Sequence, residues 1–501
     1  MRYSEWLKSA PLALAASSTG ATSLPDDLFE LTVGEAAQLI CRQAVSSRQL
    51  TEMWLQRIDA HAHLNAFISV DAQAALAKAE AYDLYVSKGG PCLPLGGVPI
   101  AVKDNIQVKG FSNTAGTPAL AAFQPREQAP VIDRLEAAGA IIIGKTNMQE
   151  LAYGTSGYNT AFHVPGVIGV RNAYDPSRIA GGSSSGSASA VGARLVPAAL
   201  GTDTGGSIRQ PCALNGCVGF RPSVGRYNQQ GVTPISPTRD TVGPMTRSVE
   251  DAMLLDQVIT GQPAAPARPP QGIRLGVPEQ FWQELEPAVA VQARKALGEL
   301  ERAGVQLVPV SLPGLHELDA QVGMPIALYE GKASLQAYLE HSHSGVSLEQ
   351  LAAQISSPDV RSLFEQFIMP QKIPTADGQV GDLLAAYRWA MDHGRAQMLE
   401  QYQAVFSAHS LDALIFPTTP ERAILSNPQA SSFAAFSRMI RNANPGSNVS
   451  LPGISLPAGL AGTPALPVGL EIDSLPHSDS QLLAIALTLQ GILGRQPGPA
   501  L

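Results

Sequence analysis

Apolar residues recur in this 501-residue chain at helical and then at strand spacing, in an order that repeats. Residues 131–138 place their apolar side chains on one helical face, and Gly139 follows as a stop signal. Ala140–Ile143 is then too apolar and β-branched for anything but a buried strand. The same order returns over residues 289–310, where Gly304 separates helix from strand. Helices that alternate with short apolar strands predict an α/β fold whose sheet is covered by helices on both faces.

The remaining segments complete this outline. Residues 263–270 are rich in proline and alanine and predict an extended surface connection. Residues 312–407 are more polar and rich in helical patterns, with one irregular loop at 370–381, and we interpret them as a helical cap on the main sheet. Strand-like patterns return at 411–417 and 452–470.

Composition agrees with one large globular unit. Only 15% of residues are charged and 45% are apolar, while the 46 glycines and 39 prolines stay below the share that marks disorder. The net charge of −8 and the lack of any basic cluster argue against a nucleic-acid partner. No apolar run is long enough for a membrane-spanning helix. We predict an N-terminal extension over residues 1–30 and a single domain over 31–501, with its core motifs at 95–260.

The N-terminus and the cysteines indicate whether the protein is exported or stays in the cytoplasm. The apolar stretch Ala10–Ala16 has only the minimum length of a signal-peptide core, and Glu5 stands where a basic region belongs, so we predict no export. The four cysteines form no C-x-x-C pair and are too few for a disulfide framework in so long a chain. We therefore expect reduced thiols and a cytoplasmic location. The cysteines are Cys41, Cys92, Cys212 and Cys217.

Residues 139–146 match the letter pattern of a phosphate-binding loop, G-x-x-x-x-G-K-[ST]. Such a loop must bend so that its backbone N–H groups face the phosphates, and a strand should precede it. Here the four middle positions, Ala140–Ile143, are themselves strand residues whose branched side chains resist that bend. We interpret the match as a strand and predict no nucleotide site.

Gly182–Gly186 matches G-x-S-x-G, the nucleophile elbow of α/β-hydrolases, with Ser184 as the nucleophile. That elbow needs a strong strand directly before it, and residues 175–180 form none; the later histidines stand in no recognisable catalytic context. An esterase that uses Ser184 stays open as a remote alternative. The H-x-H pairs at His61 and His341 lie in polar surroundings, and we interpret them as exposed rather than metal-binding.

Three further segments carry residue types that fit nucleophilic catalysis. Lys103 ends an apolar approach, so burial should disfavour its charged form. Gly181–Ser187 follows, and Ser207 stands 24 residues after Ser183 within Gly201–Arg209. Adjacent glycines before a serine leave backbone N–H groups free to converge on one point, as an oxyanion hole requires. The polar and apolar residues that border these glycines distinguish the segments from flexible linkers.

Together, these three segments resemble the amidase signature family. The similarity covers roughly residues 30–495. It implies the family's fold, a large mixed β-sheet covered by helices on both faces. Ser185 stands where the family more often has a second glycine, and we expect only a local adjustment there. The other segments that agree are Gly144–Met148, Gly219–Arg226, Asp240–Met245 and Asp412–Thr418.

The resemblance also implies a mechanism. Ser207 would be the nucleophile that forms an acyl-enzyme, Ser183 a proton relay whose peptide bond is cis, and Lys103 a general base that is neutral at rest. Backbone N–H groups would form the oxyanion hole, and neighbouring side chains would hold the loop in shape. The implied oxyanion-hole residues are Thr204, Gly205, Gly206 and Ser207, and the supporting residues are Asp203, Arg209 and Ser184.

Within the family, residues 235–241 and 440–452 look most like the indoleacetamide and mandelamide hydrolases. This likeness implies a small-molecule substrate, a primary arylacetamide-type amide cleaved to carboxylate and ammonia. The alternative is the A subunit of a tRNA-dependent amidotransferase, which takes ammonia from glutamine and needs partner chains. An inactive scaffold would be expected to have lost Lys103 or Ser207, and both are present. The family implies no metal or organic cofactor, and a homodimer is the expected assembly.

Overall fold

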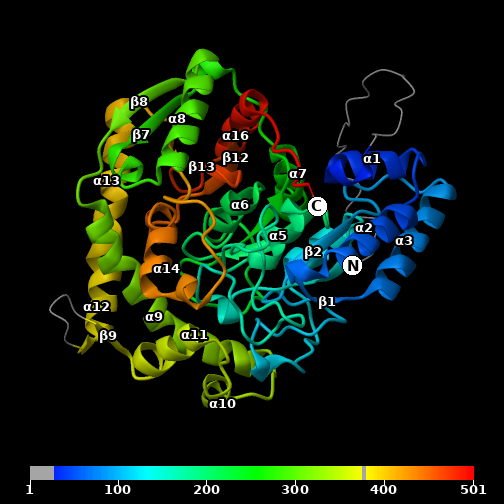
Figure 1. Ribbon diagram of the computed structural model, residues 1–501, viewed down its shortest axis with the longest axis horizontal. Helices are drawn as coiled ribbons and strands as arrows, with labels where there is room; N and C mark the ends of the chain where they lie inside the picture. The colour runs from blue at the N-terminus through cyan, green and yellow to red at the C-terminus, as the bar shows by residue number, and fades with distance from the viewer. Residues whose placement is uncertain (1–26, 375–379, 501) are drawn as a thin grey trace.

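An eleven-stranded mixed sheet runs through the centre of the computed structural model, which describes residues 27–374 and 380–500 (Figure 1). The strands are β1 (Phe67–Val70), β2 (Pro99–Lys103), β3 (Ile141–Thr146), β4 (Ala198–Asp203), β5 (Val218–Arg221), β6 (Thr241–Thr246), β7 (Arg274–Pro278), β8 (Gln306–Val310), β11 (Ala413–Pro417), β12 (Gly453–Ala461) and β13 (Leu466–Asp473). Their order across the sheet is β1-β3-β2-β4-β6-β5-β12-β13-β11-β7-β8. Strand β2 is parallel to β3 and β4, whereas β4 is antiparallel to β6, so the predicted mixed sheet is confirmed.

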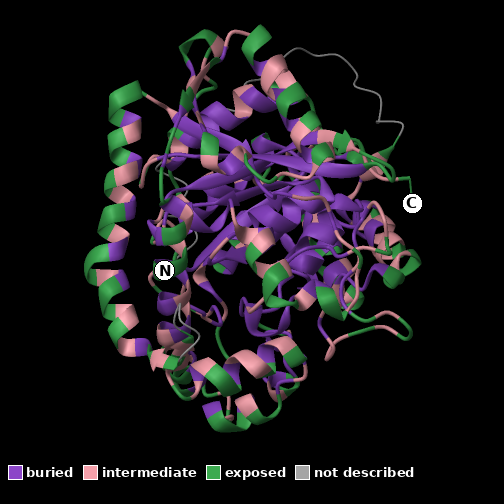
Figure 2. Cartoon of the chain, turned by 60° about the vertical axis from the view of Figure 1, so that its left-hand side comes forward, coloured by how far each residue is buried: buried purple, intermediate pink, exposed green. Residues whose placement is uncertain are grey.

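Helices cover both faces of this sheet, as alternate residues of its central strands show. Ile100 and Val102 of β2 join a hydrophobic cluster with α1, α4 and α7, whereas Ala101 faces a second cluster with α5 and α6. Figure 2 shows the resulting buried interior around the sheet. The helices outside residues 312–407 are α1 (Val33–Cys41), α2 (Ser47–Ala60), α3 (Ala72–Ser87), α4 (Pro130–Ala137), α5 (Ser185–Gly192), α6 (Arg209–Asn215), α7 (Val249–Thr260), α8 (Pro287–Arg302), α14 (Phe433–Ile440), α15 (Asn444–Asn448) and α16 (Asp479–Leu493).

Residues 312–407 are largely helical, as the sequence predicts. The loop at 370–381 is more regular than expected, because it contains two short strands, β9 (Lys372–Pro374) and β10 (Val380–Asp382), that pair with each other. The longest of the described helices, α9, contacts α15. The helices of this region are α9 (Leu315–His341), α10 (Leu348–Ala353), α11 (Pro358–Leu363), α12 (Leu383–Trp389) and α13 (Arg395–His409).

The expected helix–strand alternation is confirmed at both places where the pattern is strongest. Helix α4 leads into β3, and α8 leads into β8. Strand β3 occupies most of residues 139–146 and is buried throughout, so this segment is a strand and not a phosphate-binding loop. Residues 263–269 form an extended connection outside any helix or strand. The predicted N-terminal extension lies mostly outside the described residues.

The expectation of four reduced cysteines is wrong in this structure. Cys41 pairs with Cys92, and Cys212 pairs with Cys217, with Cα separations of 5.5 and 4.6 Å that suit disulfides. Cys41 ends α1 and Cys92 follows α3, so only the folded chain brings these two residues together. Cysteine counting along the sequence could not find that pairing.

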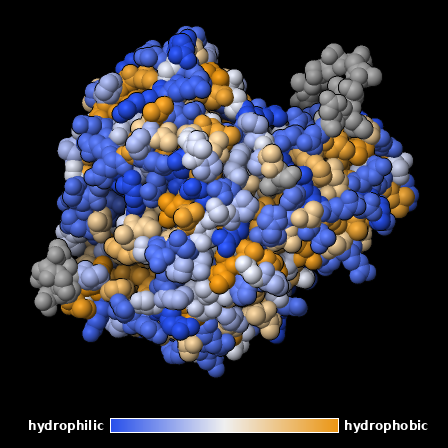
Figure 3. All heavy atoms as spheres, in the orientation of Figure 1, coloured by the Kyte–Doolittle hydropathy of each residue, from blue (hydrophilic) through white to orange (hydrophobic). Residues whose placement is uncertain are grey.

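The surface is mixed in character. Figure 3 shows hydrophilic side chains over most of the face seen in Figure 1, with apolar residues in separate patches, as is usual for a globular protein. Within the described ranges, no helix combines the length and the apolarity needed to cross a bilayer.

Candidate active site

Lys103 ends the fully buried strand β2 and is itself 0% exposed. Its Nζ lies 2.7 Å from Ser183 Oγ and 2.7 Å from Thr202 Oγ1. Burial lowers the pKa of Lys103 to about 7, although the charges of Asp203 and Asp240 act in the opposite direction. Near neutral pH, a large fraction of this amine therefore carries no extra proton and can act as a base.

Ser183 lies in the loop before α5, and the peptide bond between Gly182 and Ser183 is cis. The side chain of Ser183 is fully buried, and its carbonyl oxygen accepts a hydrogen bond from the N–H of Gln149 at 3.2 Å. The loop is packed tightly, because a Cβ on Gly182 would lie 3.1 Å from the carbonyl oxygen of Gly154. Ser183 is thus held against Lys103 by the surrounding backbone.

Ser207 lies beside this loop, in the turn between β4 and α6. The backbone N–H of Ser184 donates to the carbonyl oxygen of Ser207 at 3.2 Å, which joins the two segments next to Ser183. Ser207 is partly exposed, in contrast to the buried Lys103 and Ser183, and its hydroxyl forms no hydrogen bond with any described residue. The structure therefore brings the three predicted residues into one site, with Ser207 outermost.

Asp203 holds the turn that carries Ser207 through two hydrogen bonds. One carboxylate oxygen of Asp203 accepts the N–H of Gly206 at 2.7 Å, and the other accepts the N–H of Ile208 at 3.1 Å. The N–H of Gly206 is therefore used within the turn. The backbone N–H groups of Gly205 and Ser207 donate to no described residue.

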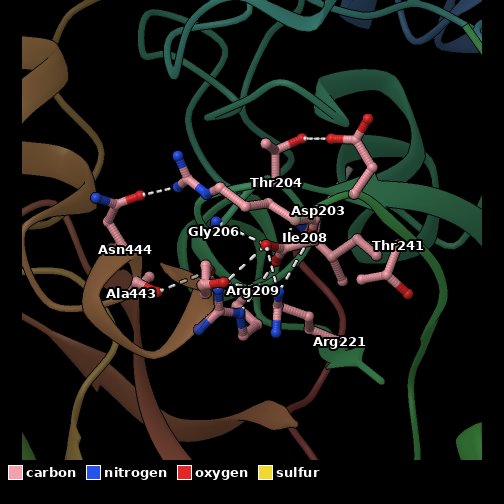
Figure 4. A network of polar contacts seen from close by, with 12 residues as sticks. Asp203, Thr204, Gly206, Ile208, Arg209, Arg221, Thr241, Ala443 and Asn444 are labelled. Atoms are coloured by element: carbon pink, nitrogen blue, oxygen red, sulfur yellow. Dashed lines mark hydrogen bonds and ion pairs between the residues drawn. The ribbon is translucent and has the colours of Figure 1, made fainter. Parts of the chain in front are cut away.

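Asp203 is in turn held by two buried arginines (Figure 4). Arg209 donates to both of its carboxylate oxygens, at 3.0 and 3.1 Å, and Arg221 Nε lies 3.4 Å from it. Burial by itself would raise the pKa of Asp203, but the two guanidinium groups outweigh it and hold that pKa at about 2. The carboxylate of Asp203 is therefore ionised near neutral pH and can hold the turn there.

Sequence reasoning missed several residues of this site. Thr202 accepts hydrogen bonds from both Lys103 and Asn105 Nδ2, the latter at 3.1 Å. Glu471 and Asp473 on β13 lie beside Arg209, and burial raises the pKa of both carboxyl groups. A hydroxyl at the end of β4, facing the end of the parallel neighbour β2, was the one available signal for Thr202. Nothing in the sequence pointed to β13.

Two serines next to Ser183 have backbone partners. The Ser184 hydroxyl donates to the carbonyl oxygen of Thr202 at 3.1 Å, accepts the N–H of the same residue at 3.2 Å, and is fully buried. This arrangement removes support for Ser184 as an esterase nucleophile. Ser185 begins α5 and donates to the carbonyl oxygen of Ser183 at 3.4 Å, so a side chain fits at this position.

Comparisons with known proteins find similarity to amidases. The family model for amidases matches residues 49–483. Mandelamide hydrolase of Pseudomonas putida is 58% identical, over 95% of this chain and 94% of its own length. Indoleacetamide hydrolase of Agrobacterium vitis is 37% identical, over 92% and 96% respectively. The X-ray structure of native peptide amidase from Stenotrophomonas maltophilia superposes with a TM-score of 0.78 at 29% identity, covering 94% of this chain and 98% of that one.

Proposed function

The chain belongs to the amidase family, and from this premise we propose that it hydrolyses a primary carboxamide of the arylacetamide type to a carboxylate and ammonia. The observation that carries the proposal is the 2.7 Å contact between Lys103 Nζ and Ser183 Oγ, directly beside Ser207. The 58% identity to mandelamide hydrolase supports an aryl substrate over glutamine, the substrate that the amidotransferase alternative requires.

The first half of the reaction forms an acyl-enzyme. Ser207 Oγ attacks the carbonyl carbon of the amide, its proton passes to Ser183 Oγ, and the proton of Ser183 passes to Lys103 Nζ. The tetrahedral intermediate collapses when a proton returns from Lys103 through Ser183 to the leaving nitrogen. The C–N bond then breaks, ammonia departs, and the acyl group remains as an ester on Ser207.

Water completes the cycle. A water molecule attacks the ester carbonyl and gives its proton to Lys103 through Ser183, and the Ser207 alkoxide leaves as it takes that proton back. Lys103 serves both halves because its pKa of about 7 allows it to gain and to lose a proton at neutral pH. The carboxylic acid product ionises on release.

The negative charge that develops on the carbonyl oxygen needs donors that are already in place. The backbone N–H groups of Gly205 and Ser207 are free to serve, whereas that of Gly206 already donates to Asp203. We therefore assign the oxyanion hole to the turn from Thr204 to Ser207. Within it, the Gly206 N–H donates to Asp203 and maintains the conformation of the turn. Removal of one such donor in comparable enzymes costs about 2.7–4 kcal/mol of transition-state stabilisation.

Ammonia release from the purified protein tests this function. The substrates are mandelamide, phenylacetamide, indoleacetamide, malonamate and glutamine, and Ser207→Ala is the matched control. We expect ammonia from the aryl amides, none from glutamine, and none from Ser207→Ala, whose thermal unfolding should match that of the wild type. Turnover of glutamine without turnover of aryl amides would favour the amidotransferase alternative instead.

Three further expectations stay as proposals. A homodimer is the assembly that the family resemblance implies, and sedimentation of the purified protein tests it. A cytoplasmic location, which the two disulfides leave without its support from reduced thiols, and a single domain over residues 31–501 stay predictions. Fractionation of cells and limited proteolysis, respectively, are the direct measurements.

A further inference from the structure

A second carboxylate, that of Asp240, binds the turn that carries Ser207, at the residue that follows Asp203. Thr204, the first residue after β4, donates from its hydroxyl to Asp240 Oδ1 at 2.6 Å, the bond marked by the dashed line at Thr204 in Figure 4. Asp240 directly precedes β6 and is only 7% exposed. The mechanism proposed above gives Asp240 no role.

Asp240 itself is fixed by groups outside the turn. Its Oδ2 accepts the backbone N–H groups of Ile235 and Ser236, both at 2.9 Å. All three donors to this carboxylate are neutral, and among the described residues it forms no ion pair. Each of its oxygens is therefore hydrogen-bonded, but no ion pair with a described residue compensates the buried charge, so this carboxylate depends on those three donors.

The segment that supplies those donors is anchored in turn on the cap. The Ser236 hydroxyl donates to Glu330 Oε2 on α9 at 2.6 Å, and the Thr238 hydroxyl donates to Glu330 Oε1 at 3.0 Å. Because Asp240 is held by this anchored segment, it presents a fixed acceptor to Thr204. The hydroxyl of Thr204 is therefore the link through which the segment holds the turn.

The turn needs such a link because glycine fills its next two positions. Gly206 adopts a positive φ of 120°, and a Cβ at this position would lie 2.9 Å from Ala443 Cβ, so only glycine fits. Gly205 is partly exposed. Asp203 holds the second half of the turn through the N–H groups of Gly206 and Ile208. The first half, which starts at Thr204, is held by the hydrogen bond from the Thr204 hydroxyl to Asp240.

We propose that Asp240 is a positioning residue that, through the hydroxyl of Thr204, orients the backbone N–H groups of Gly205 and Ser207 toward the developing oxyanion. This inference rests on the proposed function of the same site. Two carboxylates then hold the turn: Asp203 accepts the N–H groups of Gly206 and Ile208, and Asp240 accepts the hydroxyl of Thr204. Oriented donors stabilise a transition state only if they need not move when the charge appears.

Asp240 also acts on the base at a distance. The carboxylates whose charges raise the pKa of Lys103 against its burial are those of Asp203 and Asp240. Burial raises the pKa of Asp240 to about 6, against its hydrogen bonds and the charge of Arg239, which lower it. The buried phenol of Tyr153 has its pKa raised by burial and by the charge of Asp240. Removal of the charge at 240 should therefore lower the pKa of Lys103, a change that a purely structural role would not produce.

The test compares three variants of hydroxyl side chains on mandelamide. Thr204→Val removes the hydroxyl and should lower kcat by about 10- to 100-fold with KM within about threefold, since the donors act mainly in the transition state. Thr204→Ser keeps the hydroxyl and should recover most of that loss. Ser223→Ala removes a comparable buried hydroxyl–carboxylate bond, from Ser223 Oγ to Asp479 Oδ2 at 2.8 Å, which ends neither on the turn nor on the segment that holds Asp240. It should keep kcat within about threefold of wild type.

Asp240→Asn provides a second arm that does not depend on the threonine. It should lower kcat, and the double variant Thr204→Val/Asp240→Asn should lose no more than the worse single variant, because both changes break one link. In Asp240→Asn, the acidic limb of the pH profile of kcat/KM should lie at lower pH than in the wild type. Equal kcat for Thr204→Val and wild type, or equal loss in Thr204→Val and Thr204→Ser, would overturn the proposal.

A reagent that needs no substrate separates this proposal from the proposed function. An alkyl fluorophosphonate phosphonylates an active serine: the Ser207 Oγ–P bond forms, fluoride leaves, and the serine proton passes to Lys103. We expect slower labelling of Thr204→Val and Asp240→Asn than of wild type and of Ser223→Ala. If the two variants are labelled more slowly but the wild type turns over no aryl amide, the proposed substrate is refuted and the positioning role of Asp240 is supported. If the wild type is an active amidase and the two variants are labelled at its rate, the positioning role is refuted.

Discussion

Protonation of Lys103 should switch the enzyme off within the range of pH where the fold is intact. The amine is 0% exposed and lies within 2.7 Å of two hydroxyl oxygens, so water does not solvate its charged form. Burial therefore lowers its pKa from 10.5 to about 7. Since only the neutral amine can accept the serine proton, activity should increase as pH rises through 7.

The size of the effect follows from the same values. A lysine with a pKa of 10.5 is neutral in about one molecule in 3,000 at pH 7, whereas one with a pKa of about 7 is neutral in about half. Burial thus supplies a gain of about 10³ in available base. Below pH 6, kcat/KM should fall by about tenfold for each further unit of pH, and above pH 8 it should level off.

The assay is kcat/KM for ammonia release from mandelamide between pH 5.5 and 9, with circular dichroism to show that the protein stays folded. Lys103→Arg is the matched variant, because arginine keeps its proton at every pH of the series and should be inactive throughout. A profile that is flat from pH 6 to 8, or that falls as pH rises, would refute the assignment of Lys103 as the base.

Three other perturbations follow from buried contacts. Arg209→Leu leaves the carboxylates of Asp203 and Glu471 without their main cation and should lower the free energy of unfolding in urea by about 3–5 kcal/mol. Arg48→Leu breaks exposed ion pairs and should lower that free energy by less than about 1 kcal/mol. Equal losses in the two variants would contradict the argument from burial. Cys41→Ser opens the 51-residue loop closed with Cys92 and should cost about 4 kcal/mol; identical urea midpoints with and without dithiothreitol in the wild type would show that no disulfide contributes. Ser184→Ala should lose about 1–3 kcal/mol of stability but still release ammonia, and its complete inactivity would reopen the esterase alternative.

Local patterns predicted the parts of the site that lie on continuous segments. The apolar approach to Lys103 placed it at the end of a buried strand, and glycines around Ser183 and Ser207 marked loops where backbone groups are exposed to chemistry. Strand β3 was recognised for a similar reason, because branched residues in Ala140–Ile143 exclude a bent loop. These inferences needed only neighbours along the chain.

Contacts between segments that are distant in the sequence were not predicted. Arg209 and Glu471 are 262 positions apart, and no spacing in the sequence reveals that β13 ends beside the turn. Cys41 and Cys92 meet only because α1 and the segment after α3 pack together. Asp240 was visible within a family motif, but its partner Thr204 is supplied by a strand-end turn 36 residues away. Each of these contacts is a product of sheet order, which local periodicity does not determine.

Identification of the acylated residue tests the central claim most directly. The wild type and Ser207→Ala are mixed with mandelamide, quenched with acid during turnover, digested, and searched by mass spectrometry for a peptide that carries a mandeloyl ester. The account predicts the ester on Ser207 in the wild type, and neither ester nor ammonia release in Ser207→Ala. An ester on Ser183 or Ser184, or ammonia release from Ser207→Ala at the wild-type rate, would contradict it.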